Sequence, residues 1–410
     1  MISMDRSHPA ERQLPSLRGL TYAEGVNVEQ IVDAVRPQVE SGVVPGAVVG
    51  ILDRGRERVA AIGATEPDGS TPLAADTVMR ISSNTKPLIA ALALVLIEAG
   101  MLDLTDAVEK YLPELANRRV LRHPGANLDD TVPAQRSATV EDLLTMRMGF
   151  GHVLDGPSPA VATATAAGLG FGPPDPTSPP PPDEWIARFA TLPLLDQPGT
   201  TWRYEISFAV LGVLLARATA TPLDVLLCER LLEPLGLSDT AFHSSTEALP
   251  PAYLRNDDGT LVLFDGSGQD SRWTVAPAFP DACGGLVSTA SDLLRFAGVL
   301  LGGGAPLMSA PSVQAMTTDA LTPAQRAAPS AAPFLNGGGW GYGVGIADTP
   351  GGRRYGWAGG LGTLWWSWPD RDTAAVLLTQ VMPPAPTVFD AFTNTIESAL
   401  SSQPPPTTMP

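Results

Sequence analysis

The chain has 410 residues, of which 26 are basic and 43 are acidic, so its formal net charge at pH 7 is −17. A balance this acidic disfavours binding to nucleic acid or to an anionic membrane surface. A hydrophobic content of 44% supplies a sizeable core and excludes a disordered chain.

The start of the chain is polar and has no apolar core of a signal peptide. We therefore expect an N-terminal extension over residues 1–20 and a cytoplasmic protein. The longest apolar stretch, residues 88–97, is about half as long as a bilayer span, so we expect no transmembrane helix. Cys228 and Cys283 lack partners at metal-site spacing. We expect them to be buried, with no disulfide, metal or cofactor.

The first predicted elements are a surface helix and a hairpin. Residues 28–40 have apolar side chains at helical spacing and are followed by Gly42. Two β-rich runs come next, residues 47–52 and 58–62, and a turn-forming stretch separates them. An antiparallel sheet is therefore predicted to begin here.

The next stretch, Arg80-Ile81-Ser82-Ser83-Asn84-Thr85-Lys86-Pro87, leads into an apolar segment with the spacing of a buried helix. Pro87 fits the first turn of that helix, where few amide donors have partners. Ser83 and Lys86 then share one face, with the serine at the positive end of the helix dipole. This geometry suits an activated serine, although a helix-capping serine beside a solvated lysine is the commoner explanation of such spacing.

The lysine content favours the catalytic explanation. Lys86 and Lys110 are the two lysines of the chain, and every other basic residue counted is arginine. A desolvated lysine can give up its proton, whereas arginine cannot. A lysine retained at position 86 is therefore informative.

The middle of the chain is predicted to be mainly helical. A proline-rich stretch, residues 157–182, is predicted to form no regular element and to be a loop or a lid. Helical spacing is found in residues 106–112, 140–146, 183–189, 208–218, 223–232 and 290–301.

The end of the chain returns to strands, and these must meet the strands at the start. We predict an α+β fold, an α/β sandwich plus an all-α region, with one antiparallel sheet built from both termini. Residues 21–82 and 335–402 would form the sheet domain, residues 83–334 a mainly helical domain, and residues 403–410 a tail. The predicted strands are residues 340–347, 355–357, 363–368 and 374–380, followed by a helix over residues 387–400.

Three motifs occur in order along the chain: Ser83-Asn84-Thr85-Lys86, Tyr204 in Trp202-Arg203-Tyr204-Glu205-Ile206-Ser207, and Trp357-Ala358-Gly359. They resemble the motifs of serine hydrolases with the class C β-lactamase and penicillin-binding-protein fold. The resemblance is greatest to the esterase branch called family VIII carboxylesterases. Less specific similarity extends over most of the chain.

The resemblance implies a mechanism. Ser83 would form an acyl-enzyme, and the backbone amides of Ser83 and Gly360 would hold the oxyanion. Lys86 and Tyr204 would share the role of base, each lowering the effective pKa of the other. Which of the two is the formal base stays open, because coupled groups titrate as a unit. The residues assigned to substrate binding are Trp357, Ala358, Gly359, Ile206 and Phe150.

The second and third motifs depart from those of β-lactamases and DD-peptidases, which are typically Tyr-x-Asn and Lys-Thr-Gly. Ile206 stands in place of the asparagine, and Trp357 and Ala358 replace the lysine and threonine. The anchors for an anionic β-lactam are then missing, unless Arg353 or Arg354 compensates. We therefore predict a small-molecule partner, most simply a neutral ester with a short to medium acyl group.

Other reactions and roles are alternatives to the esterase hypothesis. An acyltransferase would use the same acyl-enzyme, and a β-lactamase or D-peptidase-type enzyme would cleave an amide. A catalytically silent binding protein is disfavoured by the retention of Ser83, Lys86 and Tyr204 together. A Ser-His-Asp hydrolase is excluded by the absence of a Gly-x-Ser-x-Gly motif, and His152 is the one histidine whose position merits attention.

Overall fold

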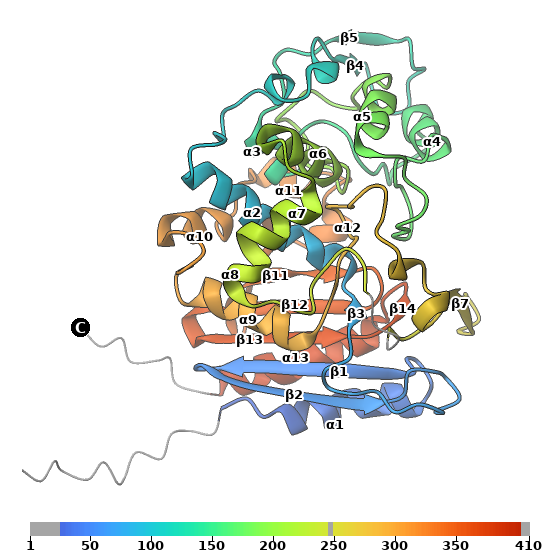
Figure 1. Cartoon of the computed structure of the whole chain (residues 1–410), viewed down its shortest axis with the longest axis vertical. Coiled ribbons are helices and arrows are strands. Elements are labelled where there is room, and N and C mark those ends of the chain that lie inside the picture. The colour runs from blue at the N-terminus through green and yellow to red at the C-terminus, as the bar shows by residue number, and fades with distance from the viewer. Residues whose placement is uncertain (1–24, 245–248, 403–410) are drawn as a thin grey trace, which may run out of the picture.

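The computed structural model describes residues 25–244 and 249–402. The predicted N-terminal extension, residues 1–20, and the predicted tail, residues 403–410, lie outside the described residues. In Figure 1 the strands of a large sheet and the helices beside it occupy the lower part of the view, and most of the other helices lie above them.

A seven-stranded antiparallel sheet contains strands from both ends of the chain. The strand order is β2-β1-β13-β12-β11-β10-β9, and Val49 in β1 lies opposite Leu377 in β13. The prediction of an antiparallel sheet built from both termini is therefore confirmed. The strands are β1 (Gly46–Asp53), β2 (Arg56–Gly63), β9 (Gly339–Trp340), β10 (Gly345–Thr349), β11 (Gly352–Gly359), β12 (Thr363–Trp368) and β13 (Thr373–Leu378).

Successive side chains of a strand point to opposite faces, so β1 contributes to two cores. Val49 and Ile51 pack in the core that also contains side chains of α1 (Val28–Glu40) and α13 (Pro386–Ser401). Val48 belongs to the larger core on the other side of the sheet. The first and last helices thus cover one face together, as their apolar spacing predicts.

The opposite face of the sheet is covered by α9 (Ala290–Leu301). Gly50 in β1 permits this close packing, because a Cβ there would lie 2.9 Å from Cδ1 of Leu294. α9 falls within the range that the sequence analysis assigned to the helical domain. We keep the two-domain division of the chain as a proposal, with α9 added to the sheet domain.

The helical region surrounds α2 (Thr85–Glu98), in which all residues from Thr85 to Leu94 are buried. A helix that is apolar on all sides needs neighbours on all sides. Its described neighbours include α6 (Ser207–Thr219) and the turn Cys228–Leu232, and α6 in turn contacts α3 (Val140–Leu144) and α5 (Pro182–Ala190) (Figure 1). The predicted buried helix is therefore present, and Pro87 occupies its first turn.

Two segments differ from their predictions. Residues 106–112 form only a short 3₁₀ turn, Val108–Lys110. The carbonyl of Asp106, which an α-helix would bond to the amide of Lys110, accepts instead from the amide of Val140 (3.1 Å). Residues 157–182 do contain a regular element, α4 (Pro159–Ala166). Ser158 caps this helix by accepting from the amide of Val161 (3.5 Å), a start signal that the proline content obscured.

The helix predicted over residues 223–232 is interrupted. α7 (Leu223–Leu227) continues through a π-helical turn, Cys228–Leu232, into α8 (Glu233–Leu235). Cys283 is buried, as expected, whereas Cys228 is partly exposed and donates to Glu233 (3.7 Å). The expectation that both cysteines are buried is therefore wrong for Cys228.

Several short elements have no counterpart in the sequence analysis. One pair matters for the site: β3 (Met79–Arg80) pairs with β8 (Val287–Ser288) immediately before Ser83. The others are β4 (Arg119–Leu121), β5 (Thr131–Pro133), β6 (Ala252–Arg255), β7 (Leu261–Asp265), β14 (Val381–Met382), α10 (Ala310–Met316), α11 (Pro323–Arg326) and α12 (Ala332–Leu335).

In the part of the chain that the structure describes, no single helix has both the length and the apolar character of a membrane span. Among the described helices, the pair Ser207–Thr219 and Leu223–Leu235 passes that test together, across a bend of 83°.

Candidate active site

The turn that carries Ser83 is held by contacts from two directions. β3 pairs with β8, and the hydroxyl of Thr363 in β12 donates to the carbonyl of Ile81 (2.8 Å). Ser82 has a φ of 46°, a left-handed conformation that costs energy for any residue except glycine. Its hydroxyl accepts from the amide of Leu361 (3.3 Å). Surrounding structure thus imposes the conformation from which Ser83 projects.

Lys86 lies one helical turn from Ser83, and its side chain is completely buried. Its Nζ donates to the hydroxyl oxygen of Ser83 at 2.9 Å and to the carbonyl of Cys283 at 2.7 Å. The third contact is with Oε1 of Glu205 at 3.4 Å. An ammonium has three donors, so these partners together fit the protonated form of Lys86.

Tyr204 approaches this pair from the segment that precedes α6. Nζ of Lys86 lies 4.5 Å from the centroid of the Tyr204 ring. The phenolic oxygen accepts a hydrogen bond from Nε1 of Trp357 in β11 at 2.7 Å. Because an indole nitrogen only donates, Trp357 marks this oxygen as an acceptor. The structure therefore brings the residues of all three motifs together.

The pKa values of the pair are both raised. Burial lowers the pKa of Lys86, but the charges of Tyr204 and Glu205 outweigh it and raise that pKa above its usual value. Burial raises the pKa of Tyr204, and the opposing charge of Lys86 does not cancel the effect. The expectation that each group lowers the pKa of the other is therefore wrong for Lys86. Both shifts favour the protonated forms, an ammonium at Lys86 and a phenol at Tyr204.

Glu205 was missed as a functional residue by the sequence analysis, although it stands directly after Tyr204. Its carboxylate lies between Lys86 and His152, with Oε2 at 3.4 Å from Nε2 of the histidine. Burial raises the pKa of Glu205, but the charge of Lys86 and the His152 hydrogen bond outweigh it, so the pKa lies below its usual value. His152 thus contacts the site through Glu205.

A cavity of about 420 Å³ opens beside Ser83. Phe150, predicted to bind substrate, does not line it: this side chain is fully buried, with its ring against Phe171 and Phe189. That assignment is wrong, because Phe150 is a core residue. The other predicted positions that line the cavity are Ser83, Tyr204, Ile206, Trp357, Ala358, Gly359 and Gly360.

Gly359 is needed for close approach of β11 to the nucleophile turn. A Cβ at this position would lie 2.5 Å from the carbonyl oxygen of Ile81 and 2.1 Å from the hydroxyl of Thr363. Any larger residue would push the strand away from Ser83. The next residue, Gly360, then lies in the wall of the same cavity as Ser83.

The geometry agrees with what comparison of the whole sequence shows. A sequence model of the family described as Beta-lactamase matches residues 31–400. The chain belongs to the beta-lactamase family. The family membership predicted from the three motifs is therefore confirmed.

The proteins that this chain resembles in sequence include one named as an esterase. Protein Rv1367c of Mycobacterium tuberculosis (strain ATCC 25618 / H37Rv) is 34% identical over 378 residues, which are 87% of this chain and 91% of that protein. Esterase EstB of Burkholderia gladioli is 29% identical over 248 residues, which are 57% of this chain and 59% of EstB.

The fold is shared with a solved structure titled "EstCE1, a hydrolase with promiscuous acyltransferase activity". The TM-score is 0.74 at 22% identity, over 91% of this chain and 98% of that chain. The predicted fold class is therefore confirmed.

The described lining of the cavity is acidic. Among the described residues that line the cavity, the charged ones are Asp175, Glu205 and Asp281, and none is basic. Burial and the nearby Glu205 raise the pKa of Asp281 to about 6. Arg353 donates to the carbonyl of Thr317 and Arg354 pairs with Glu397 (2.5 Å), so neither supplies the missing cationic anchor.

Metal ligation is a separate matter. Within residues 25–244 and 249–402, no group of three or more histidine, cysteine, aspartate or glutamate side chains is arranged to hold a metal ion.

Proposed function

We propose that this protein is a carboxylesterase that cleaves small, neutral esters through an acyl-enzyme on Ser83. The observation that carries the proposal is the 2.9 Å contact between the Ser83 hydroxyl and Lys86, beside a cavity whose described lining has no basic residue. The esterase relative EstB supports the same reaction class.

The first step requires a base. Loss of one proton from the coupled Lys86 and Tyr204 pair leaves it able to take the proton of Ser83 as the hydroxyl oxygen attacks the ester carbonyl. The backbone amides of Ser83 and Gly360 would receive the oxyanion, and removal of one such donor costs about 3 kcal/mol. Collapse of the intermediate breaks the ester C–O bond, and the pair returns the proton to the leaving alcohol.

The second step releases the acyl group. Water attacks the acyl-enzyme, the Lys86 and Tyr204 pair takes one of its protons, and the Ser83 oxygen leaves with that proton. An alcohol in place of water would make the protein an acyltransferase. The structural likeness to EstCE1, whose title names both activities, makes this the second candidate function.

Substrate charge follows from the cavity. The cations nearest the cavity are already paired with its carboxylates, Arg272 with Asp175 and Lys86 with Glu205. An anionic β-lactam would therefore bring its carboxylate to a described wall that offers no free cation. An unpaired charge in such a place costs several kcal/mol. A neutral ester avoids this cost, so the carboxylesterase proposal predicts that esters exceed nitrocefin in kcat/KM by at least about a hundredfold.

The test compares p-nitrophenyl acetate and butyrate with nitrocefin, with and without an added alcohol. Fluorophosphonate labelling followed by mass spectrometry should place the adduct on Ser83. Its neighbour Ser82 is the matched control, since it lies in the same turn but bonds the amide of Leu361. An adduct on Ser82, or faster cleavage of nitrocefin than of either ester, contradicts the proposal.

A further inference from the structure

One wall of the cavity is formed by residues 169–179, here called the roof segment, which connects α4 to α5. Leu169, Pro173, Pro174 and Asp175 from this segment line the cavity. A proline-rich segment without regular backbone pairing takes its position from side-chain contacts. The contacts of the roof segment therefore decide where this wall stands.

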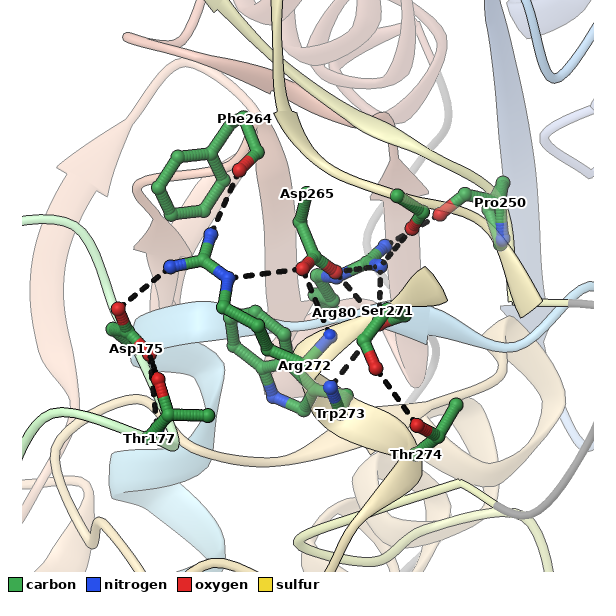
Figure 2. A network of polar contacts seen from close by, with 11 residues as sticks. Arg80, Asp175, Thr177, Pro250, Phe264, Asp265, Ser271, Arg272, Trp273 and Thr274 are labelled. Carbon is green, nitrogen blue, oxygen red and sulfur yellow. Dashed lines mark hydrogen bonds and ion pairs between the residues drawn. The ribbon is translucent and has the colours of Figure 1, made fainter. Parts of the chain in front are cut away.

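Asp175 makes the strongest of these contacts. Its Oδ1 accepts from the amide and hydroxyl of Thr177, at 2.9 and 2.7 Å, which shapes the segment locally. Its Oδ2 accepts from Nη1 of Arg272 at 2.6 Å (Figure 2). The two side chains are 26% and 27% exposed, so solvent and salt screen this ion pair less than a pair in open water.

The other two nitrogens of the Arg272 guanidinium are also hydrogen-bonded. Nε donates to Oδ1 of Asp265 at 3.0 Å, and Nη2 donates to the carbonyl of Phe264 at 2.8 Å. The guanidinium also lies over the Phe264 ring, 4.4 Å from its centroid. Figure 2 shows Arg272 between Asp265 and Asp175. Because two of its nitrogens are already bonded, the guanidinium of Arg272 loses little conformational freedom when the third nitrogen binds Asp175.

The same network reaches the nucleophile turn. Asp265 pairs with Arg80, whose buried guanidinium also donates to Ser271 at 2.9 Å. Arg80 is the last residue of β3, three positions before Ser83. A Cβ on Gly284 would lie 3.8 Å from the Pro174 side chain and 3.5 Å from the Ser82 backbone. Roof segment and nucleophile turn are thus supported by one cluster and border the same glycine.

We propose that the Asp175–Arg272 ion pair holds the roof segment at the distance from Ser83 that sets acyl-chain length, which makes both residues specificity-determining. This inference rests on the proposed esterase function. With the pair intact, the apolar wall contacts the methylenes of a longer acyl group. Without it, the wall moves away and the longer chain loses these contacts, whereas an acetyl group has few to lose.

The variant that tests this is Asp175→Asn, because asparagine retains the oxygen that accepts from Thr177 and loses the charge. The readout is the ratio of kcat/KM for p-nitrophenyl hexanoate to that for p-nitrophenyl acetate. We expect the ratio to fall about tenfold, the effect of a lost methylene contact in an apolar pocket. Arg272→Lys should also lower the ratio, because a lysine ammonium cannot reproduce the bonds made by all three guanidinium nitrogens of Arg272.

The matched control is Asp183→Asn. Asp183 also pairs with an arginine from a distant segment, Arg217 at 2.8 Å, but it does not line the cavity. Its variant should leave the hexanoate to acetate ratio unchanged. Amide hydrogen exchange of residues 169–179 should become faster in Asp175→Asn and stay the same in Asp183→Asn.

An unchanged ratio in an active Asp175→Asn protein overturns the specificity role alone, whatever the exchange rates. Unaltered exchange in the roof segment overturns the structural link between the ion pair and this wall. Failure of the unmodified protein to cleave either ester overturns the proposed function and the specificity role with it.

Discussion

At the scale of single residues, three partners hold Lys86 in its protonated form, and one of them is the carboxylate of Glu205. A charge at 3.4 Å in a buried site acts strongly on the pKa of its neighbour. The Lys86 and Tyr204 pair therefore needs alkaline conditions to lose the proton that would let it act as a base. Activity should rise with pH.

Glu205→Gln should move this rise to lower pH. The negative charge of Glu205 raises the pKa of both Lys86 and Tyr204, so its removal lowers both and the pair loses its proton earlier. We expect a shift of about one pH unit in the ascending limb of kcat/KM. Glu184→Gln, at an exposed carboxylate paired with Arg188, is the control. An ascending limb at the same pH in Glu205→Gln as in the unmodified protein contradicts the role given to Glu205.

Trp357→Phe should move the ascending limb of kcat/KM to higher pH. The hydrogen bond from Trp357 lowers the pKa of Tyr204, and phenylalanine keeps the ring but removes the donor. The pKa of Tyr204 then rises and the base forms only at higher pH. The measurement is again kcat/KM against pH, and a shift toward lower pH would refute the assignment.

Lys86→Ala and Tyr204→Phe should each remove most activity, and the double variant should be little worse than either, because groups that act as one unit are not additive. The measurement is single-turnover acylation by p-nitrophenyl acetate. Retention of more than about a tenth of the rate in Tyr204→Phe would assign that residue a structural role.

Ser83 and Lys86 were predicted to share one helix face from their spacing, and Tyr204 was added to them by the resemblance of its motif to that of a known family. The sequence did not predict Glu205 as a partner of Lys86, because that contact joins positions 119 residues apart and no spacing rule describes it. Phe150 was assigned to substrate binding, whereas its side chain is buried against Phe171 and Phe189.

At the scale of elements, the turn before α2 is tied to strand β12 by the hydroxyl of Thr363. This hydroxyl donates to the carbonyl of Ile81 and accepts from the Asn84 side chain (3.0 Å). The sequence shows the helix behind Ser83 through its apolar spacing. The β3 and β8 pair beneath it was missed, because each strand has only two residues.

Thr363→Val should leave the buried side-chain amide of Asn84 without its hydrogen bond. The carbonyl of Ile81 would lose one bond and keep the one from the Asn84 backbone amide (3.1 Å). An unsatisfied buried group costs about 1–3 kcal/mol, so the free energy of unfolding in urea should fall by that amount or more, and kcat should fall with it. Thr395→Val, where the hydroxyl bonds the carbonyl of Ala391 one turn earlier (2.7 Å), is the control. Equal effects of the two changes would show that the turn has no special dependence on Thr363.

At the scale of the whole molecule, the seven-stranded sheet lies between two hydrophobic cores, one on each of its faces. The sequence predicted the large sheet from β-rich runs at both ends of the chain and from the turn between the first two of them. It could not show which face α9 would cover, since that depends on Gly50 and Leu294 meeting across the chain. It also missed the small sheet β14-β6-β7, whose strands are short and in which β14 lies far from β6 and β7 in sequence.

Phe392→Ala should separate stability from catalysis. Phe392 in α13 is fully buried in the core shared with α1, on the face of the sheet away from α9. Its truncation should lower the free energy of unfolding by about 3–5 kcal/mol, with kcat of the folded protein within twofold of its original value. Asp390→Ala, at an exposed position on the same helix, is the control. A large loss of kcat in folded Phe392→Ala would link this core to the site.

The position of β1 between β2 and β13 has a consequence for biosynthesis. β1 ends at Asp53 and β13 begins at Thr373, so one edge of the early hairpin stays unpaired until almost the whole chain has left the ribosome. An open strand edge invites pairing with other chains. Ser83 also emerges long before Trp357 and Gly360. No nascent fragment can therefore assemble the site, and the step that closes the sheet is the step that creates a complete reaction centre.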